Sequence, residues 1–159
     1  MKRCILFLLF CICFFSGCGI NLNEYPGSSD KPFINYYSSE LAKDLSENQS
    51  LEIMVFETNL SSEVNVSEAD KEVFISFLGN LKEDSFIANV SDYIELPKVP
   101  AFKLYIKTYK NKYVINVYNE KVISLYPWDG LYEEDFLTME YTPKAYNLHS
   151  LCKYILSNK

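Results

Sequence analysis

Glycine and histidine are scarce in this chain of 159 residues, and both shortages exclude classes of binding site. None of the five glycines falls in a P-loop or dinucleotide-binding pattern, so no nucleotide cofactor is expected. The single histidine, His149, and Cys152 three residues later provide too few ligands for a zinc site. The sequence therefore predicts a protein without a metal and without a cofactor.

Long apolar runs are also missing, with one exception near the N-terminus. Cys4 to Phe15 is an unbroken run of twelve apolar residues, whereas a membrane-spanning helix needs roughly 20. Lys2 and Arg3 precede the run and Ser16-Gly17-Cys18 follows it, as in a secretory signal that ends in a lipobox. We therefore expect a lipoprotein signal peptide over residues 1–17, with cleavage before Cys18 and lipid, palmitate included, on Cys18. An uncleaved anchor and cleavage at another bond are the alternatives.

Basic residues and cysteines would both be few in the mature chain. Removal of the signal lowers the number of basic residues from 15 to 13 against 21 acidic residues, so the net charge becomes −8. This charge argues against nucleic acid as a partner, because such binding depends on basic side chains at phosphates. The partner would instead be the lipid bilayer, contacted through acylated Cys18 on the extracellular face of the cell membrane. Cys152 would be the one other cysteine, which excludes an intramolecular disulfide.

The composition divides the mature chain into a tether and a domain. Residues 18–32 are rich in Asn, Pro, Gly and Ser, and we expect them to hold the lipidated cysteine and a flexible tether. Residues 33–159 are long enough for a single domain that buries its own core.

Three segments of this domain carry helical signals. Leu41 and Leu45 lie four residues apart behind Ser38-Ser39, which predicts a short helix with a serine cap. Ser67 to Asp70 resembles a capping box before an apolar stripe, which predicts a helix near 67–79. Thr142-Pro143 supplies an N-cap and a first helical residue for a second main helix near 143–156.

Alternation of apolar and polar residues predicts the sheet. Strands are expected over Leu51–Glu57, Phe86–Leu96 and Phe136–Tyr141, and three more, joined by short turns, between Phe102 and Tyr126. The predicted fold class is α+β: one antiparallel meander with two main helices packed on one face. The other face would be wetter and would carry Lys103, Tyr105, Lys107, Tyr109, Asn116 and Tyr118.

The candidate ligand-binding residues surround a tight turn, Pro127-Trp128-Asp129-Gly130. One interpretation is that the turn is a binding site. Trp128 and the flanking Tyr126 and Tyr132 would then stack on a glycan or peptide, and the carboxylates of Asp129, Glu133 and Glu134 would accept hydrogen bonds from it. The other interpretation is purely structural: the turn would bury its tryptophan and precede a solvated acidic loop. The acids lack the Asp-x-Asp-x-Asp-Gly spacing of a calcium loop, so no Ca²⁺ is expected.

No catalytic residue emerges from the sequence. His149 and Cys152 lie one helical turn apart, but Cys152 shares the apolar stripe of Leu148, Leu151 and Ile155 and is predicted to be a core residue. No serine occupies a Gly-x-Ser-x-Gly elbow.

Three stretches resemble a known family: Tyr113–Glu120 (YVINVYNE), Tyr126–Gly130 (YPWDG) and Tyr146–Ile155 (YNLHSLCKYI). They are similar to a family of uncharacterised clostridial lipoproteins that shares a domain of unknown function. The resemblance covers most of the mature chain. It implies a Gram-positive cell surface, and it implies no activity and no catalytic residue.

The sequence thus favours a non-enzymatic surface lipoprotein, a binding or accessory module at the cell envelope. Its ligand would be an envelope protein, a peptide or a wall glycan. One alternative is a carboxylate-dependent extracellular hydrolase that acts on wall glycan or peptide with the acids between Asp129 and Asp135. Another is a structural subunit of an envelope complex, which a large exposed apolar patch would indicate.

Overall fold

The computed structural model describes residues 31–48, 50–88 and 96–158 of the chain. The expected signal peptide, Cys18 and most of the expected tether lie outside the described residues, and so does much of the strand expected over Phe86–Leu96. Within the described part of the chain, no helix is long and apolar enough to cross a membrane.

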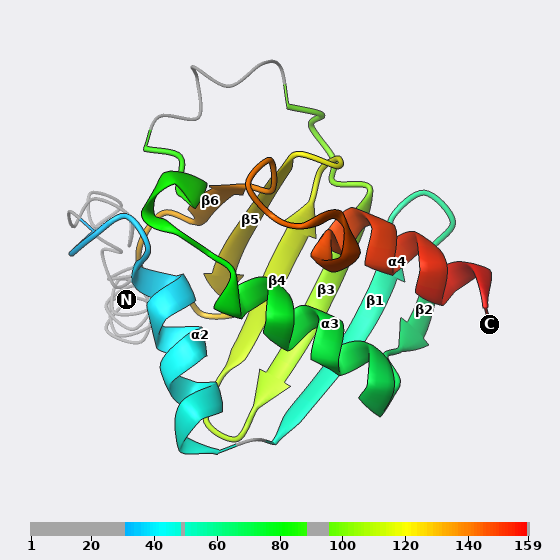
Figure 1. Ribbon diagram of the computed structural model, residues 1–159, viewed down its shortest axis with the longest axis horizontal. Helices are drawn as coiled ribbons and strands as arrows, with labels where there is room; N and C mark the ends of the chain where they lie inside the picture. Colours follow the sequence, from blue (N-terminus) through cyan, green and yellow to red (C-terminus); the bar gives the residue numbers. More distant parts are fainter. Residues whose placement is uncertain (1–30, 49, 89–95, 159) are drawn as a thin grey trace, which may run out of the picture.

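The fold is α+β, as the sequence predicts, and it is built on a six-stranded antiparallel sheet (Figure 1). The strands are β1 (Leu51–Glu57), β2 (Ser62–Asn65), β3 (Phe102–Thr108), β4 (Lys112–Val117), β5 (Val122–Pro127) and β6 (Asp135–Thr138). Their order across the sheet is β2-β1-β3-β4-β5-β6. Every neighbouring pair except β1 and β3 is consecutive in sequence, so short turns make most of the connections.

The predicted meander is formed by β3, β4 and β5. Its register sets Leu104 opposite Ile115 and Ile115 opposite Leu125, which aligns apolar side chains in one row across three strands. The turn between β4 and β5 is held by Asn119, whose side-chain oxygen accepts hydrogen bonds from the backbone N–H groups of Lys121 and Val122 at 2.8 and 2.9 Å.

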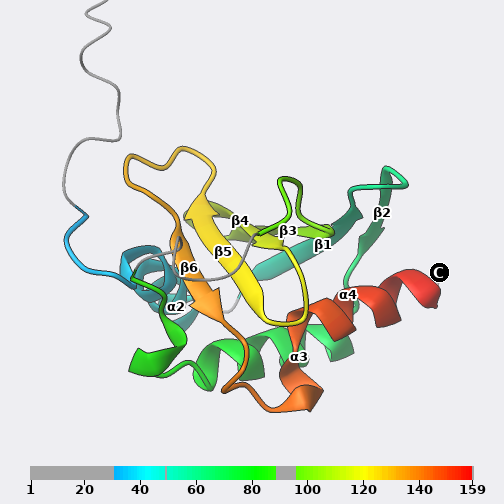
Figure 2. The same cartoon turned by 90° about the horizontal axis from the view of Figure 1, so that it is seen from above.

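The three described α-helices cover the same face of the sheet (Figure 2). They are α2 (Tyr36–Glu47), α3 (Glu68–Gly79) and α4 (Leu148–Ser157), with short 3₁₀ turns at Glu83–Ser85 and Lys144–Tyr146. Leu41 of α2, Phe74 and Phe77 of α3 and Leu148 of α4 are each at most 1% exposed. The core is therefore one layer between the sheet and the helices, and none of the described helices covers the opposite sheet face.

The expected helix starts are correct for α3 and wrong for the other two helices. Ser67 caps α3, with its side chain accepting from the Asp70 N–H. The helix expected from Thr142-Pro143 starts later, because Pro143 begins a 3₁₀ turn and Asn147 is the residue that caps α4.

The serine cap expected for α2 is also wrong. Ser38 lies inside the first turn, and Asn35, at the N-cap position, makes no side-chain capping bond. The Ser38 N–H instead donates to the carboxylate of Asp135, 97 residues away, at 2.7 Å. A buried carboxylate from β6 thus replaces the local cap.

Two strand expectations need correction as well. β2 is absent from the sequence-based expectation, since Val64 is its one apolar residue. In the described part of the expected strand over Phe86–Leu96, Phe86 forms an isolated bridge to Leu137 beside β6.

Candidate functional site

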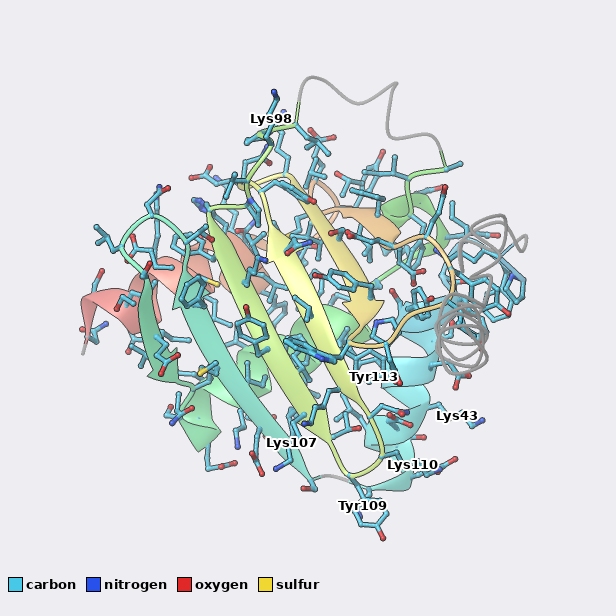
Figure 3. The ribbon with its side chains drawn as sticks, turned by 180° about the vertical axis from the view of Figure 1, so that it is seen from behind. Lys43, Lys98, Lys107, Tyr109, Lys110 and Tyr113 are labelled. Atoms are coloured by element: carbon cyan, nitrogen blue, oxygen red, sulfur yellow. The ribbon has the colours of Figure 1, made fainter. Side chains whose placement is uncertain are left out.

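The candidate site lies on the sheet face that the helices leave open (Figure 3). Side chains alternate along each strand, so Met54, Tyr105, Val114 and Tyr126, which lie opposite one another in register, all point to this face. The register gives the same side to Lys103, Lys107 and Asn116, as the alternation in the sequence predicts. Tyr109 is different, because it lies beyond β3 in the turn before β4 and is 72% exposed.

An aromatic groove crosses this open face between β1 and the turn after β5. The ring centroids of Phe56 and Tyr105 are 6.4 Å apart and those of Tyr105 and Trp128 are 6.1 Å apart, so three rings adjoin. The groove has a volume of about 540 Å³. Its walls and rim include Glu52, Met54, Phe56, Glu63, Asn65, Tyr105, Lys107, Lys112 and Trp128.

Trp128 is the most exposed ring of the groove, with 67% of its surface accessible. Its backbone N–H donates to the carbonyl of Lys112 at 2.9 Å, which fixes the turn to β4 and leaves the indole free. The structural interpretation of a buried tryptophan is therefore wrong. Large exposed aromatic rings in a groove are typical of recognition surfaces.

The rim of the aromatic groove carries charges of both signs. Lys107 donates to both carboxylate oxygens of Glu52, at 3.0 and 3.1 Å, and both side chains are more than half exposed. Lys112 and Glu63 complete the charged rim. A ligand on the rings would thus meet both hydrogen-bond donors and acceptors at the edge.

A polar cluster lies beside the groove on the same face. Burial raises the pKa values of both Tyr118 and Tyr126, and the nearby Glu134 carboxylate raises them further. Hydrogen bonding with Ser124 opposes the shift at Tyr118, and hydrogen bonding with Asn116 opposes it at both tyrosines. Asn116 donates to the Ser124 hydroxyl at 3.2 Å. The Asn116 Oδ1 and Glu134 Oε2 atoms are buried and have no hydrogen-bond partner among the described residues. Tyr126 and Glu134, both predicted as ligand-binding residues, therefore belong to this cluster.

The acidic residues after the turn are separated by the fold. Asp135 is fully buried, with one carboxylate oxygen 2.5 Å from the ammonium of Lys31 and the other bonded to the Ser38 N–H. Glu133 and Asp129 are exposed. Among the described residues, no group of three or more His, Cys, Asp or Glu side chains is placed to hold a metal ion.

Asp129 and Tyr132 line a second, smaller hollow on the other side of the turn, which we call the tyrosine hollow. Its volume is about 250 Å³, and it is lined by Tyr36, Tyr37, Glu40, Asn111, Tyr113, Pro127, Asp129, Gly130, Leu131 and Tyr132. Gly130 does not have a positive φ; its lack of a side chain matters because a Cβ there would lie 3.1 Å from the Tyr37 hydroxyl. The structure therefore divides five of the six predicted binding residues among three places and leaves Glu133 on the exposed surface outside them.

Cys152 and His149 have different surroundings, although both belong to α4. Cys152 is fully buried, and burial raises the pKa of its thiol well above the ordinary value, as expected of a core residue. The His149 ring lies against Phe102, with centroids 5.3 Å apart. Cys152 is thus a core side chain rather than an activated nucleophile.

Phe56 and Glu52 are groove residues that the sequence analysis did not select. Both alternate with the buried residues of β1, and this alternation was the sequence signal that places them on the face opposite the core. Phe56 and Glu52 lie near Trp128 because β1 pairs with β3, a contact between segments about 50 residues apart in the sequence.

Comparison with known proteins agrees with this fold. Residues 31–152 match a family model described as a domain of unknown function, DUF4883. The chain belongs to the DUF4883 family. A crystal structure described as "Putative Lipoprotein from Clostridium perfringens" is 32% identical, with a TM-score of 0.71, over 81% of this chain and 99% of that chain. No curated protein matches the chain. The resemblance inferred from the sequence is thus confirmed, and it assigns no activity.

Proposed function

We propose that this protein is a surface lipoprotein, anchored in the cell membrane by lipid on Cys18, that acts as a non-enzymatic binding module at the cell envelope. The lipobox at Ser16-Gly17-Cys18 supports the anchor. The similar Clostridium protein, which is described as a lipoprotein, supports the same location. The ligand would be met outside the membrane, where wall glycan and wall peptides are the abundant polymers.

The aromatic groove is the proposed ligand site, and the exposure of Trp128 is the observation that carries the proposal. Leaving a large ring accessible forgoes the stabilisation that its burial would provide, about 1.5–3 kcal/mol for a large apolar side chain. The adjoining Tyr105 ring is inclined to the rings of Phe56 and Trp128, at interplanar angles of 62° and 55°, so the groove presents aromatic surface in more than one direction. Sugar rings suit such a surface, since their C–H faces stack on aromatic rings and their hydroxyls hydrogen-bond to mixed polar rims. We therefore favour wall glycan, with wall peptide as the alternative ligand.

The hydrolase alternative has less support. It requires two carboxylates that face each other across a substrate, about 5–10 Å apart in glycosidases. Asp135 is engaged by Lys31 and Ser38, whereas Glu134 lies near the tyrosines of the polar cluster. Asp129 faces the tyrosine hollow on the other side of the turn. The acids that the hypothesis needs are thus dispersed.

Titration of the full-length protein in detergent with soluble wall-glycan fragments and with stem peptides tests the proposal. Trp128 is the single tryptophan of the chain, so its fluorescence reports directly on the groove. We expect glycan to change this emission, and we expect Trp128→Ala to weaken binding at least tenfold in calorimetry. Tyr154→Ala is the matched control, because Tyr154 is 57% exposed but lies on α4, behind the sheet.

Three results would contradict parts of the proposal. Unchanged glycan affinity in Trp128→Ala would remove the groove as the site. Binding of stem peptide but not glycan, if Trp128→Ala abolishes it, would select the alternative ligand for the groove. Shortened glycan products in mass spectra of the incubated mixture would establish the hydrolase instead.

A further inference from the structure

The tyrosine hollow adjoins the aromatic groove, with Tyr113 in both linings, but it has a different chemistry. It lies where the first turns of α2, the start of β4 and the loop after β5 meet. At about 250 Å³ it is below the usual size of a site for a whole drug-sized ligand, but it can accept one side chain or a small head group.

The charge of the hollow is negative. Two of its ten lining residues are the acids Glu40 and Asp129, and none is a lysine or arginine. Neither acid forms an ion pair with a cation among the described residues. An anionic ligand would be repelled here, and a cation would be attracted.

A third carboxylate adds to this field from behind the wall. Asp44 is 5% exposed, and its Oδ2 accepts hydrogen bonds from Thr108, Asn111 and Tyr113 at 3.0, 2.8 and 3.0 Å. All three donors are neutral; the Lys110 ammonium, whose pKa is raised first by Glu47 and further by Asp44 and Glu40, offsets part of this negative charge from outside the hollow. The pKa of Tyr113 is raised first by burial and then by Asp44, with a contribution from Glu40, which is consistent with a negative potential at this wall.

The remaining wall is aromatic, which also favours a cation. The Tyr36 ring packs edge-on against Tyr37 and Tyr132, with centroids 5.3 Å apart in both pairs. Ring faces attract ammonium groups that approach within about 6 Å of the centroid. The chain itself provides an example, because the ammonium of Lys31 lies 5.6 Å from the Tyr37 centroid. Lys31 itself is not among the residues that line the hollow.

We propose that the tyrosine hollow binds a primary ammonium group presented by a peptide, such as a lysine-type side chain. A primary ammonium has three N–H donors, and the wall offers carboxylate acceptors on Glu40 and Asp129. A quaternary ammonium has no N–H to give them. The hollow has one lining residue, the buried Tyr113, in common with the aromatic groove and differs from it in all the others, so the protein would hold two different chemical features of the envelope on either side of one turn.

The test uses the full-length protein in detergent and Nα-acetyl-lysine amide as the probe, followed by ligand-observed NMR. We expect saturable binding that weakens as salt increases. The neutral analogue Nα-acetyl-norleucine amide should not bind, and tetramethylammonium should bind more weakly than the lysine probe. The double variant Glu40→Gln/Asp129→Asn should lose at least fivefold in affinity. Glu83→Gln/Asp84→Asn removes the same charge from exposed residues outside both the hollow and the aromatic groove and should keep the affinity.

Two outcomes overturn the assignment. The first is equal affinity of the lysine probe for wild type and for the Glu40/Asp129 variant, with both folded by circular dichroism. The second is equal or tighter binding of tetramethylammonium, which would exclude the primary amine. Trp128→Ala should not alter binding of the lysine probe, so failure of this site and failure of the aromatic groove can be distinguished.

Discussion

Replacing Asp135 with asparagine is expected to lower the free energy of unfolding by about 2–3 kcal/mol. The Asp135 carboxylate has no exposed surface and makes two contacts, with the Lys31 ammonium at 2.5 Å and with the Ser38 N–H at 2.7 Å. Asparagine fits the space and can still accept one bond. It removes the charge that faces both the lysine and the positive end of α2.

The magnitude follows from those two contacts. A hydrogen bond to a charged group contributes about 1.5–3 kcal/mol, and a charge at a helix N-terminus about 0.3–1 kcal/mol. Breaking a fully buried ion pair costs about 3–5 kcal/mol. The Lys31 side chain is 17% exposed and can turn toward water, which lowers the expected loss below that range, to about 2–3 kcal/mol.

Urea unfolding followed by far-ultraviolet circular dichroism is the appropriate measurement. Tryptophan fluorescence is a weaker reporter, because Trp128 is already 67% exposed in the folded protein. Glu133→Gln is the control, since this neighbouring acid is exposed and should change stability by less than about 0.5 kcal/mol. A Lys31→Met variant completes a double-mutant cycle with Asp135→Asn. If Asp135→Asn behaves like the control, the carboxylate does not hold α2 in place and the reasoning is refuted.

Three further predictions concern the rest of the domain. Cys152→Ser should cost about 1–3 kcal/mol in urea unfolding, because it buries a hydroxyl among apolar side chains, and Cys152→Ala should cost less if the hydroxyl is the cause. Ser61 has a φ of 49°, in the left-handed region that strains residues with a Cβ, so Ser61→Gly should raise the free energy of unfolding by about 0.5–1 kcal/mol. A lower free energy of unfolding in this variant would show that the Ser61 backbone is not strained. Burial, helped by Lys153 and opposed by Glu120, lowers the pKa of His149 below its ordinary 6.5. As the pH falls, the unfolded chain therefore protonates His149 at a higher pH than the folded chain does. The contribution of His149 to stability is complete above about pH 6.5 and is lost as the pH drops from there through the lower pKa of the folded state. His149→Asn should flatten that slope between pH 7 and 5, and an unchanged slope would assign it to other groups.

The parts of the fold that could be predicted from sequence are those with local causes. The strands β3, β4 and β5 follow from strict alternation and short turns, and the α3 start follows from the Ser67 cap. The α2 start could not be predicted, because its capping carboxylate comes from Asp135, 97 residues away. The short β2 carries too few apolar residues to show a pattern and is recruited by its pairing with β1.

The same distinction applies to the candidate site. Composition identifies Trp128 and the tyrosines as unusual, but their exposure is decided by the tertiary position of one turn. The Pro127–Gly130 turn sends Trp128 to the open face and Asp129 to the tyrosine hollow, so residues adjacent in sequence belong to different sites. The partners of each, Phe56 for one and Tyr36 for the other, come from distant segments.

The contact between Lys31 and Asp135 also limits how far the domain can move away from the membrane. With lipid on Cys18, as proposed, thirteen residue steps separate the membrane from Lys31, the first residue that the structure describes. Thirteen steps span at most about 45 Å when fully extended. The domain would therefore stay within a thin zone above the bilayer. A pulling force on the chain between Cys18 and Lys31 would act first on α2 and β6. The aromatic groove, which extends from the turn after β5 to β1, would be spared most of that load.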